Sequence, residues 1–99
     1  MTVLLADGNV GIGGDPVRLL SRARDLLGVE GALLVETGAP GSPSGPVRLC
    51  LEDDLGTSEE FPWALLAVDD VPPVAHEAGL RPAGFWKEAG RWFAALVRP

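Results

Sequence analysis

Two apolar runs, each closed by an acidic residue, constrain the fold of this chain more than any other feature. Residues 2–6 end at Asp7, and residues 32–35 end at Glu36; neither run alternates apolar with polar residues. Unalternating runs of this length are typical of strands in a parallel sheet that is buried on both faces. We therefore expect residues 2–6 to form a central strand with both faces covered.

The segment between the two runs predicts a glycine-rich turn and a helix. Residues 8–14 are rich in glycine, and Asp15-Pro16 is typical of an N-cap followed by proline at the first helical position. Gly28 is placed to end the helix in the left-handed conformation. The apolar stripe of this helix consists of Val17, Leu20, Ala23 and Leu27, flanked by Leu19 and Leu26. Strand, helix and strand then form a right-handed βαβ unit with parallel strands.

The middle of the chain predicts a loop and an antiparallel ribbon. Residues 38–46 are dominated by proline, glycine and serine, which predicts a flexible, exposed loop. Residues 47–52 alternate apolar with polar side chains, as in a strand with one face in solvent. We expect this strand to pair with residues 63–68 across the acidic turn 52–54.

A short helix is expected next. Asp69 and Asp70 are suited to cap a helix over residues 74–78, and Gly79 is placed to end it. Pro72 and Pro73 disfavour helical geometry in the residues that precede them, so the helix is expected to begin after them.

The last residues predict a hairpin. Residues 82–86 and 92–97 flank a three-residue loop in which Gly90 takes the left-handed position. In that register Phe85 lies opposite Phe93, and Trp86 lies opposite Trp92. The element order is therefore β, α, β, β-ribbon, α and β-hairpin, within one α/β domain over residues 1–99.

Composition and charge exclude several classes of function. Ninety-nine residues allow one small domain, and the net charge of -6 argues against nucleic-acid binding, which needs clustered positive charge. One cysteine excludes an internal disulfide and is too few for a structural zinc site. The first apolar run is too short for a bilayer and lacks a basic leader, so we expect no signal peptide, no membrane contact and a cytoplasmic location.

The carboxyl ends of the two parallel strands are the places to look for a ligand site, because open α/β sheets bind ligands there. Asp7 and Glu36 lie at these ends, although Asp7 can equally cap a turn and Glu36 can equally be solvated. The glycine-rich turn also resembles a dinucleotide-binding loop, but Pro16 stands where the third glycine of that motif is required. A turn that enters a capped helix is the favoured interpretation of Gly11, Gly13 and Gly14.

Other reactive side chains lack partners in the sequence. His76 is the one histidine and has no recognisable nucleophile or second ligand beside it, so we expect a surface histidine. Cys50 lies on the polar face of its predicted strand and precedes acidic residues, which makes it a poor nucleophile. The aromatic residues of the ribbon and hairpin are expected mainly to pack, although they could stack on a planar ligand; they are Trp63, Phe85, Trp86, Trp92 and Phe93.

Six sequence segments together carry a resemblance to a known family. They are LLADGNVGIGGDP, the amphipathic helix after it, GALLVE, FPWALLAVDD, HEAGL and FWKEAGRWFAAL. The chain resembles the C-terminal half of actinobacterial class I methyltransferases that use S-adenosyl-L-methionine (SAM). The resemblance implies a partial Rossmann-like sheet: the family order is 3-2-1-4-5-7-6 with the seventh strand antiparallel, and this chain would supply strands four to seven.

The resemblance also implies what this chain does not contain. The family's first strand and glycine-rich loop, which hold the methionine part of SAM, and the acid after its second strand have no counterpart here. It carries over Asp7, Gly8 and Asn9 as the residues near the transferred methyl group. We therefore expect a truncated member or remnant of the family that acts on a small-molecule acceptor and does not bind SAM alone.

Physical chemistry leads to a further expectation about partners. An interior strand that lacks a neighbour leaves its amide and carbonyl groups unpaired, which invites another chain to pair with it. We expect a homodimer or a complex with a polypeptide that supplies the missing half of the sheet. Two alternatives stay open: a noncatalytic interaction module that uses this edge strand, and a nucleotide-binding half-domain that uses the glycine-rich turn with Glu36.

Overall fold

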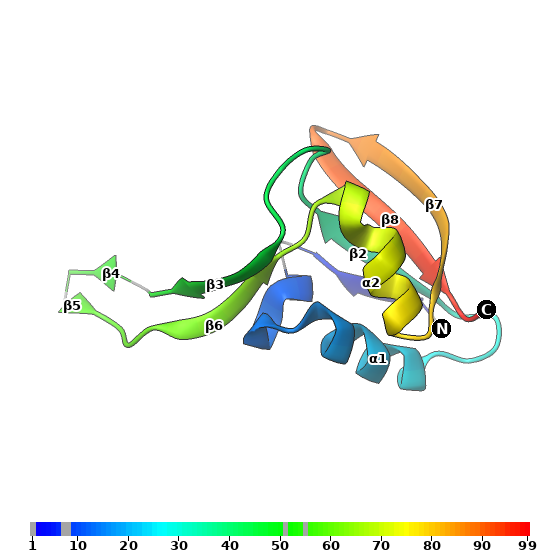
Figure 1. Ribbon diagram of the computed structural model, residues 1–99, viewed down its shortest axis with the longest axis horizontal. Coiled ribbons are helices and arrows are strands. Elements are labelled where there is room, and N and C mark those ends of the chain that lie inside the picture. The colour runs from blue at the N-terminus through cyan, green and yellow to red at the C-terminus, as the bar shows by residue number, and fades with distance from the viewer. Residues whose placement is uncertain (1, 7–8, 51, 55) are drawn as a thin grey trace.

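A computed structural model describes residues 2–6, 9–50, 52–54 and 56–99 of the chain (Figure 1). In these residues the elements follow the order expected from the sequence. They are β1 (Thr2–Leu5), η1 (Asn9–Gly14, a 3₁₀ segment), α1 (Pro16–Leu26), β2 (Ala32–Thr37), β3 (Gly45–Leu49), β4 (Glu52–Asp53), β5 (Gly56–Thr57), β6 (Phe61–Leu65), η2 (Val68–Asp70, a 3₁₀ segment), α2 (Val71–Glu77), β7 (Arg81–Glu88) and β8 (Arg91–Val97). None of the helices in this part of the chain is long and apolar enough to cross a membrane.

Four strands form the central sheet in the order β1-β2-β8-β7. β1 and β2 are parallel, as the two apolar runs predict, and β8 is antiparallel to both of its neighbours. The pairing aligns Leu4 with Leu34 and Leu34 with Ala95 across three strands. β1 therefore lies at one edge of the sheet, with β2 on one side and no strand of the described residues on the other.

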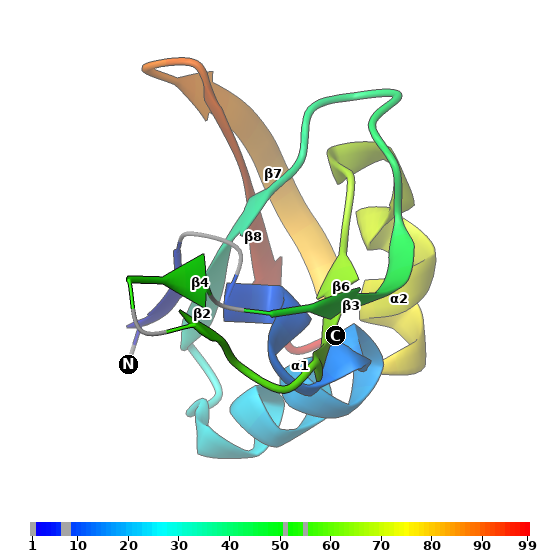
Figure 2. The ribbon, with the colours of Figure 1, turned by 90° about the vertical axis from the view of Figure 1, so that its left-hand side faces the viewer.

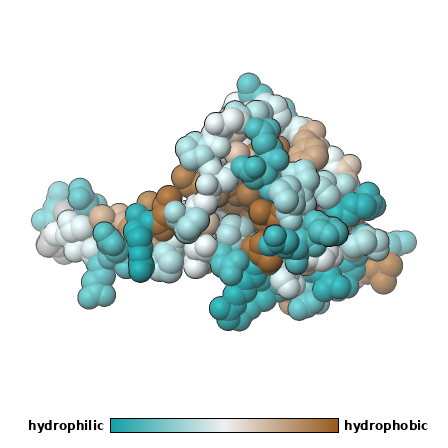
Figure 3. Space-filling model, viewed as in Figure 1, coloured by the Kyte–Doolittle hydropathy of each residue, from teal (hydrophilic) through white to brown (hydrophobic). Residues whose placement is uncertain are grey.

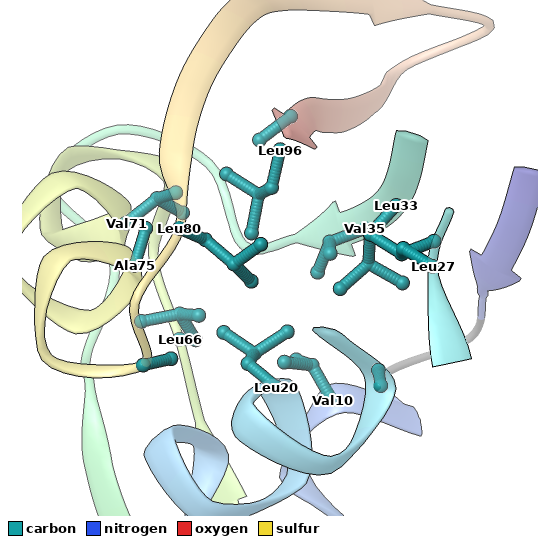
Figure 4. Packing of buried hydrophobic residues seen from close by; sticks show 13 residues of the cluster. Val10, Leu20, Leu27, Leu33, Val35, Leu66, Val71, Ala75, Leu80 and Leu96 are labelled. Carbon is teal, nitrogen blue, oxygen red and sulfur yellow. The ribbon is translucent and has the colours of Figure 1, made fainter. Parts of the chain in front are cut away.

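Both α-helices lie on the same face of this sheet (Figures 1 and 2). Leu20 of α1 meets Leu33 of β2 and Leu96 of β8 in the core between them, and all three side chains are fully buried (Figure 4). Val3 and Leu5 of β1 pack against the same cluster. Burying side chains of this size stabilises the fold by about 2 kcal/mol each.

None of the described helices lies on the opposite face of the sheet, and here the sequence-based expectation for β1 is wrong. Because side chains alternate along a strand, Leu4 points away from the core that Val3 and Leu5 contact. Leu4 is 59% exposed, so β1 is not buried on both faces. The same face carries Leu34 and Phe93, which are half-buried. The apolar run of β1 suits a strand that is buried on both faces, but the described residues cover only one of them.

The start of α1 confirms its predicted cap, whereas its end differs from the prediction. The Asp15 carboxylate accepts a hydrogen bond from the backbone N–H of Arg18 at 3.1 Å, and Pro16 begins the helix. The helix ends through Leu27, whose backbone is extended and whose N–H donates to the carbonyl of Arg24. Gly28 does not take the left-handed conformation, because Leu27 turns inward to the core one residue earlier.

α2 begins three residues earlier than predicted and is not capped by an aspartate. Pro72 and Pro73 lie in its first turn, where a missing N–H leaves no helical hydrogen bond unmade. The Asp70 side chain makes no capping hydrogen bond, and the Asp69 carboxylate instead accepts from the backbone N–H of Gly41 at 2.6 Å. Gly79 ends the helix at a φ of 78°, which confirms its left-handed position.

The β7–β8 hairpin is confirmed, but its register is shifted by one residue. Ala89 and Gly90 form a two-residue turn with φ values of 51° and 77°. This shorter turn places Trp86 opposite Phe93, not opposite Trp92. The Trp86 and Phe93 rings stack with their centroids 5.4 Å apart, a contact that favours the observed register.

β3 and β6 form the predicted antiparallel ribbon, with Val47 opposite Trp63. The strand bounds differ from the prediction, since β3 begins at Gly45 inside the expected loop and β6 ends at Leu65. The ribbon continues into β4 and β5 and projects from the body of the molecule (Figure 1). We call residues 45–65 the arm.

Candidate functional site

A hollow of about 330 Å³ lies at the edge of the sheet where β2 ends. It collects residues that are far apart in the sequence: the end of β2, the turn after β1, the loop after β2, and β6. The lining residues are Val10, Glu36, Thr37, Gly38, Ser42, Pro43 and residues 63–66. This is the carboxyl edge of the two parallel strands, where open α/β sheets bind their ligands.

One wall of the hollow depends on a close approach between η1 and β6. Gly11 is buried, and a Cβ atom at this position would lie 1.9 Å from the carbonyl oxygen of Ala64 and 2.7 Å from Nε1 of Trp63. A side chain larger than hydrogen therefore cannot be placed here without moving β6. Close packing therefore explains why position 11 is a glycine. The contact between Gly11 and β6 also holds Trp63 at the hollow.

The other wall is a loop tied to the segment before α2. The backbone N–H of Gly38 donates to the carbonyl of Leu66 at 2.8 Å, and the N–H of Val68 donates to the carbonyl of Gly38 at 2.9 Å. Farther along the loop, the N–H of Ala67 donates to the hydroxyl oxygen of Ser44 at 2.8 Å. These hydrogen bonds hold both ends of the loop that follows β2 against residues 66–68, and they set the distance between β2 and β6.

The most prominent polar group at the hollow is the Glu36 carboxylate. Arg91 donates to it from Nε at 3.0 Å and also from Nη2, so the pair is bidentate. The Glu36 side chain is 16% exposed, and the Arg91 guanidinium lies 5.8 Å from the centroid of the Phe93 ring. Glu36 is thus not simply solvated: it faces a cation from the neighbouring antiparallel strand. Nothing in the sequence marks Arg91 as its partner, because that pairing depends on the β2–β8 register.

Of the residues predicted to lie near a transferred methyl group, Asp7 and Gly8 fall outside the described residues. Asn9 is described: it is exposed, begins η1, and its backbone N–H donates to the carbonyl of Ala6 at 3.0 Å. Asn9 immediately precedes Val10, which lines the hollow. The carboxyl end of β1 and the hollow are therefore adjacent.

The remaining candidate residues lie elsewhere. His76 is exposed on α2, and Cys50 is an exposed, free thiol beyond the end of β3. Within the part of the chain that the structure describes, no group of three or more histidine, cysteine or carboxylate side chains could hold a metal ion. Trp63 is the aromatic residue that reaches the hollow; the sequence singled it out only as one possible stacking residue among five.

Neither a protein-family model nor a curated protein matches the sequence. Solved structures do match. The chain superimposes on the CcbJ methyltransferase from Streptomyces caelestis with a TM-score of 0.64 and 15% identity, over 99% of this chain and 60% of that one. The glycopeptide N-methyltransferase MtfA in complex with SAM matches with a TM-score of 0.66 and 16% identity, over 99% of this chain and 57% of that one. A sugar N-methyltransferase from Streptoalloteichus sp. matches with a TM-score of 0.63 and 15% identity, over 98% and 55%.

These matches show the fold and its extent. The chain spans between 54% and 60% of the length of CcbJ and MtfA. The observed order β1-β2-β8-β7, with β8 antiparallel, is the order expected for strands four, five, seven and six of a class I methyltransferase. The chain therefore has a partial Rossmann-like methyltransferase fold of the α/β class.

Proposed function

We propose that the chain takes part in SAM-dependent methylation of a small-molecule acceptor, as one half of a methyltransferase site. The observation that supports this most is the hollow at the carboxyl edge of β2, in a sheet whose strand order is that of the methyltransferase half. Fold alone does not establish activity, so the proposal depends on the site. The similar MtfA structure contains SAM, and SAM is the cofactor proposed here.

The described residues could contact SAM only on the side of its methyl group. Asn9 is exposed at the carboxyl end of β1, and the hollow beside it is lined mainly by apolar and backbone groups. Together with Asp7 and Gly8, Asn9 would make polar contacts near the methyl group. SAM supplies that methyl group, and its transfer is an in-line displacement that needs orientation of the acceptor more than acid or base.

Trp63 and Glu36 contribute differently to the acceptor side. Trp63 presents an aromatic surface that can position an apolar acceptor and exclude water from it. The Glu36 carboxylate is held in place by Arg91, so it can accept a hydrogen bond from an acceptor group without changing its own position. The fold therefore restricts both side chains at the hollow, Trp63 through β6 and Glu36 through Arg91.

The two edges of the sheet differ in a way that supports a partner beside β1. β7 at one edge contains Pro82, a register shift between Pro82 and Gly84, and charged residues at both ends, which are features that discourage pairing with another strand. β1 at the other edge has the sequence TVLL, without proline, charge or bulge. An edge of this kind invites a further strand.

The uncovered face of the sheet supports the same partner. Leu4, Leu34 and Ala95 form a row across three strands on the face that lacks helices. A polypeptide that adds parallel strands beside β1 and covers this row would complete both the sheet and the cofactor pocket. A homodimer through β1 is the other form of this proposal. A cytoplasmic location is also part of it, since the one cysteine is free and the chain needs no disulfide.

Titration of the ¹⁵N-labelled chain with SAM, followed by NMR, tests the proposed function. Since half a pocket is not expected to hold SAM at physiological concentrations, we expect shifts only at millimolar SAM, confined to the amides of residues 7–10 and 36–38. The matched control is the Trp63→Leu variant, which removes the aromatic wall and should reduce these shifts. Shifts spread evenly over the surface, or no shift in this region, would overturn the proposal.

A parallel titration with NAD separates the alternatives. Shifts at residues 11–14 with NAD, and none with SAM, would favour the nucleotide-binding half-domain. Absence of response to both ligands would favour a noncatalytic interaction module that uses β1. The position of Gly11 counts against the nucleotide-binding alternative, because this glycine is buried under β6 and cannot approach a phosphate.

A further inference from the structure

Apart from residues 63–65 at its base, which line the hollow, the arm is not used by the proposed function. It is a two-stranded ribbon of β3 and β6 that continues into β4 and β5 and extends the molecule to 46 Å along its longest axis (Figure 1). A two-stranded ribbon alone in water is at best marginally stable. β6 rests on η1 at the base of the arm, but the outer part projects into solvent. Leu49, near the middle of the arm, is 39% exposed.

The arm also carries most of the net negative charge of the chain. Residues 45–65 contain one arginine and five carboxylates, a net of -4 out of the -6 of the whole chain. Glu52, Glu59 and Glu60 are exposed on it, and the space-filling view shows a hydrophilic outer end with apolar surface next to it (Figure 3). An exposed apolar side chain beside acidic groups is the composition of a docking surface for a basic, partly apolar partner.

A surface of the opposite composition lies on the outside of α1. A hollow of about 370 Å³ there is lined by Ile12, Gly13, Asp15, Arg18, Leu19 and Arg22. Ile12 is 48% exposed at its rim. Arg18 and Arg22 are exposed and make no ion pair with any residue that the structure describes. Asp15 is already engaged as the helix cap through the N–H of Arg18.

We propose that the arm of one copy of this chain docks on the α1 hollow of a second copy. In this dimer Glu59 and Glu60 face Arg18 and Arg22, and Leu49 contacts the apolar rim at Ile12. The outer part of the arm projects away from the α1 of its own copy (Figure 1), so the contact is made with a second copy. A two-fold axis forms each contact twice and closes the assembly, which gives a dimer rather than a filament.

The dimer uses neither the edge of β1 nor the uncovered face of the sheet. It is therefore independent of the proposed function, and each can fail while the other holds. Because the contact joins exposed charges, its dissociation constant should rise with salt, by contrast with an interface made only of strand pairing or apolar surface.

Two charge-reversed variants test the contact. One carries Glu59→Arg and Glu60→Arg in the arm, and the other carries Arg18→Glu and Arg22→Glu in α1. In the first variant positions 59 and 60 carry the same positive charge as Arg18 and Arg22, and in the second positions 18 and 22 carry the same negative charge as Glu59 and Glu60. We therefore expect the dissociation constant of the dimer to rise by about tenfold or more in sedimentation experiments. The α1 substitutions suit the helix, since glutamate is a good helix former and is favourable in the first turn.

An equimolar mixture of the two variants is the decisive measurement. The arginines at positions 59 and 60 of the first variant then meet the glutamates at positions 18 and 22 of the second, and Glu59 and Glu60 of the second meet Arg18 and Arg22 of the first. We expect the mixture to form a heterodimer with close to wild-type stability. Because each variant serves as the partner of the other, recovery also shows that both are folded.

Glu77→Arg on the exposed side of α2 is the control, with a charge change of the same kind away from both surfaces. It should leave the dimer unchanged. A wild-type chain that is monomeric at tens of micromolar, a dimer that withstands both reversals, or a mixture that stays monomeric while both variants are folded would each overturn the proposal.

Discussion

Arg91 at the start of β8 donates two hydrogen bonds to the carboxylate of Glu36 near the end of β2, one from Nε at 3.0 Å and one from Nη2. The two residues are 55 positions apart in the chain. This ion pair joins β2 of the parallel pair to β8 of the antiparallel hairpin, at the edge of the sheet where the candidate site lies. The ring of Phe93 lies beneath the guanidinium and restricts it further.

Glu36→Gln should lower the free energy of unfolding by about 1–2 kcal/mol, because it replaces a bidentate charged pair by a neutral amide. The Arg91 side chain is 47% exposed, so water can take over part of its interaction and keeps the loss moderate. Urea denaturation measures it. The control is Asp25→Asn, since Asp25 pairs with Arg24 at 3.6 Å on the open surface and should cost at most about 0.5 kcal/mol. Equal losses in the two variants would contradict this assignment.

Gly11→Ala should destabilise the fold by about 1–3 kcal/mol, because the added methyl group collides with the carbonyl oxygen of Ala64. It should also change the fluorescence of Trp63, whose indole nitrogen lies beside the new atom. Gly28→Ala is the matched control: Gly28 has nothing within 4 Å of an added Cβ and no positive φ, so stability should stay the same or rise slightly. If Gly11→Ala unfolds at the wild-type urea midpoint, β6 does not lie on η1 as described.

Leu4→Ala and Leu33→Ala distinguish the two faces of the sheet. Leu33 is fully buried, and its truncation should cost about 2–5 kcal/mol. Leu4 is 59% exposed on the uncovered face, so its truncation should cost under about 1 kcal/mol in the isolated chain. Thermal unfolding of both variants checks this. A large loss for Leu4→Ala would mean that something already covers that face in the isolated chain.

Ala89→Gly should stabilise the chain by about 0.5–1 kcal/mol, because Ala89 has a φ of 51° and pays a steric cost that glycine avoids. Ala83→Gly, at the exposed residue of β7 inside the register shift, where φ is not positive, should have the opposite sign. The urea midpoint of each variant, compared with that of the wild-type chain, measures the sign and size of both changes. If both substitutions destabilise, then the turn at 89–90 is not the type I′ turn that the dihedral angles describe.

Local patterns in the sequence were enough to predict each element that depends on its own neighbours. The apolar runs gave the parallel pair β1–β2, Asp15-Pro16 gave the start of α1, and Gly79 gave the end of α2, because caps and alternation act within a few residues. The resemblance in six segments also led to the observed strand order. The sequence could not show the one-residue shift of the hairpin, because two turn lengths suit the same glycine and ring stacking decides between them.

For the candidate site, the chain itself determined only that acidic and polar residues follow the two parallel strands. Tertiary structure alone decided that Trp63 closes the hollow, that Arg91 meets Glu36, and that the arm stands away from the body. The first two depend on contacts between residues more than 20 positions apart, and sequence periodicity carries no information about which distant surfaces meet. The same reason explains β1: its apolar run specifies two buried faces, but packing covers only the one that α1 and α2 can reach.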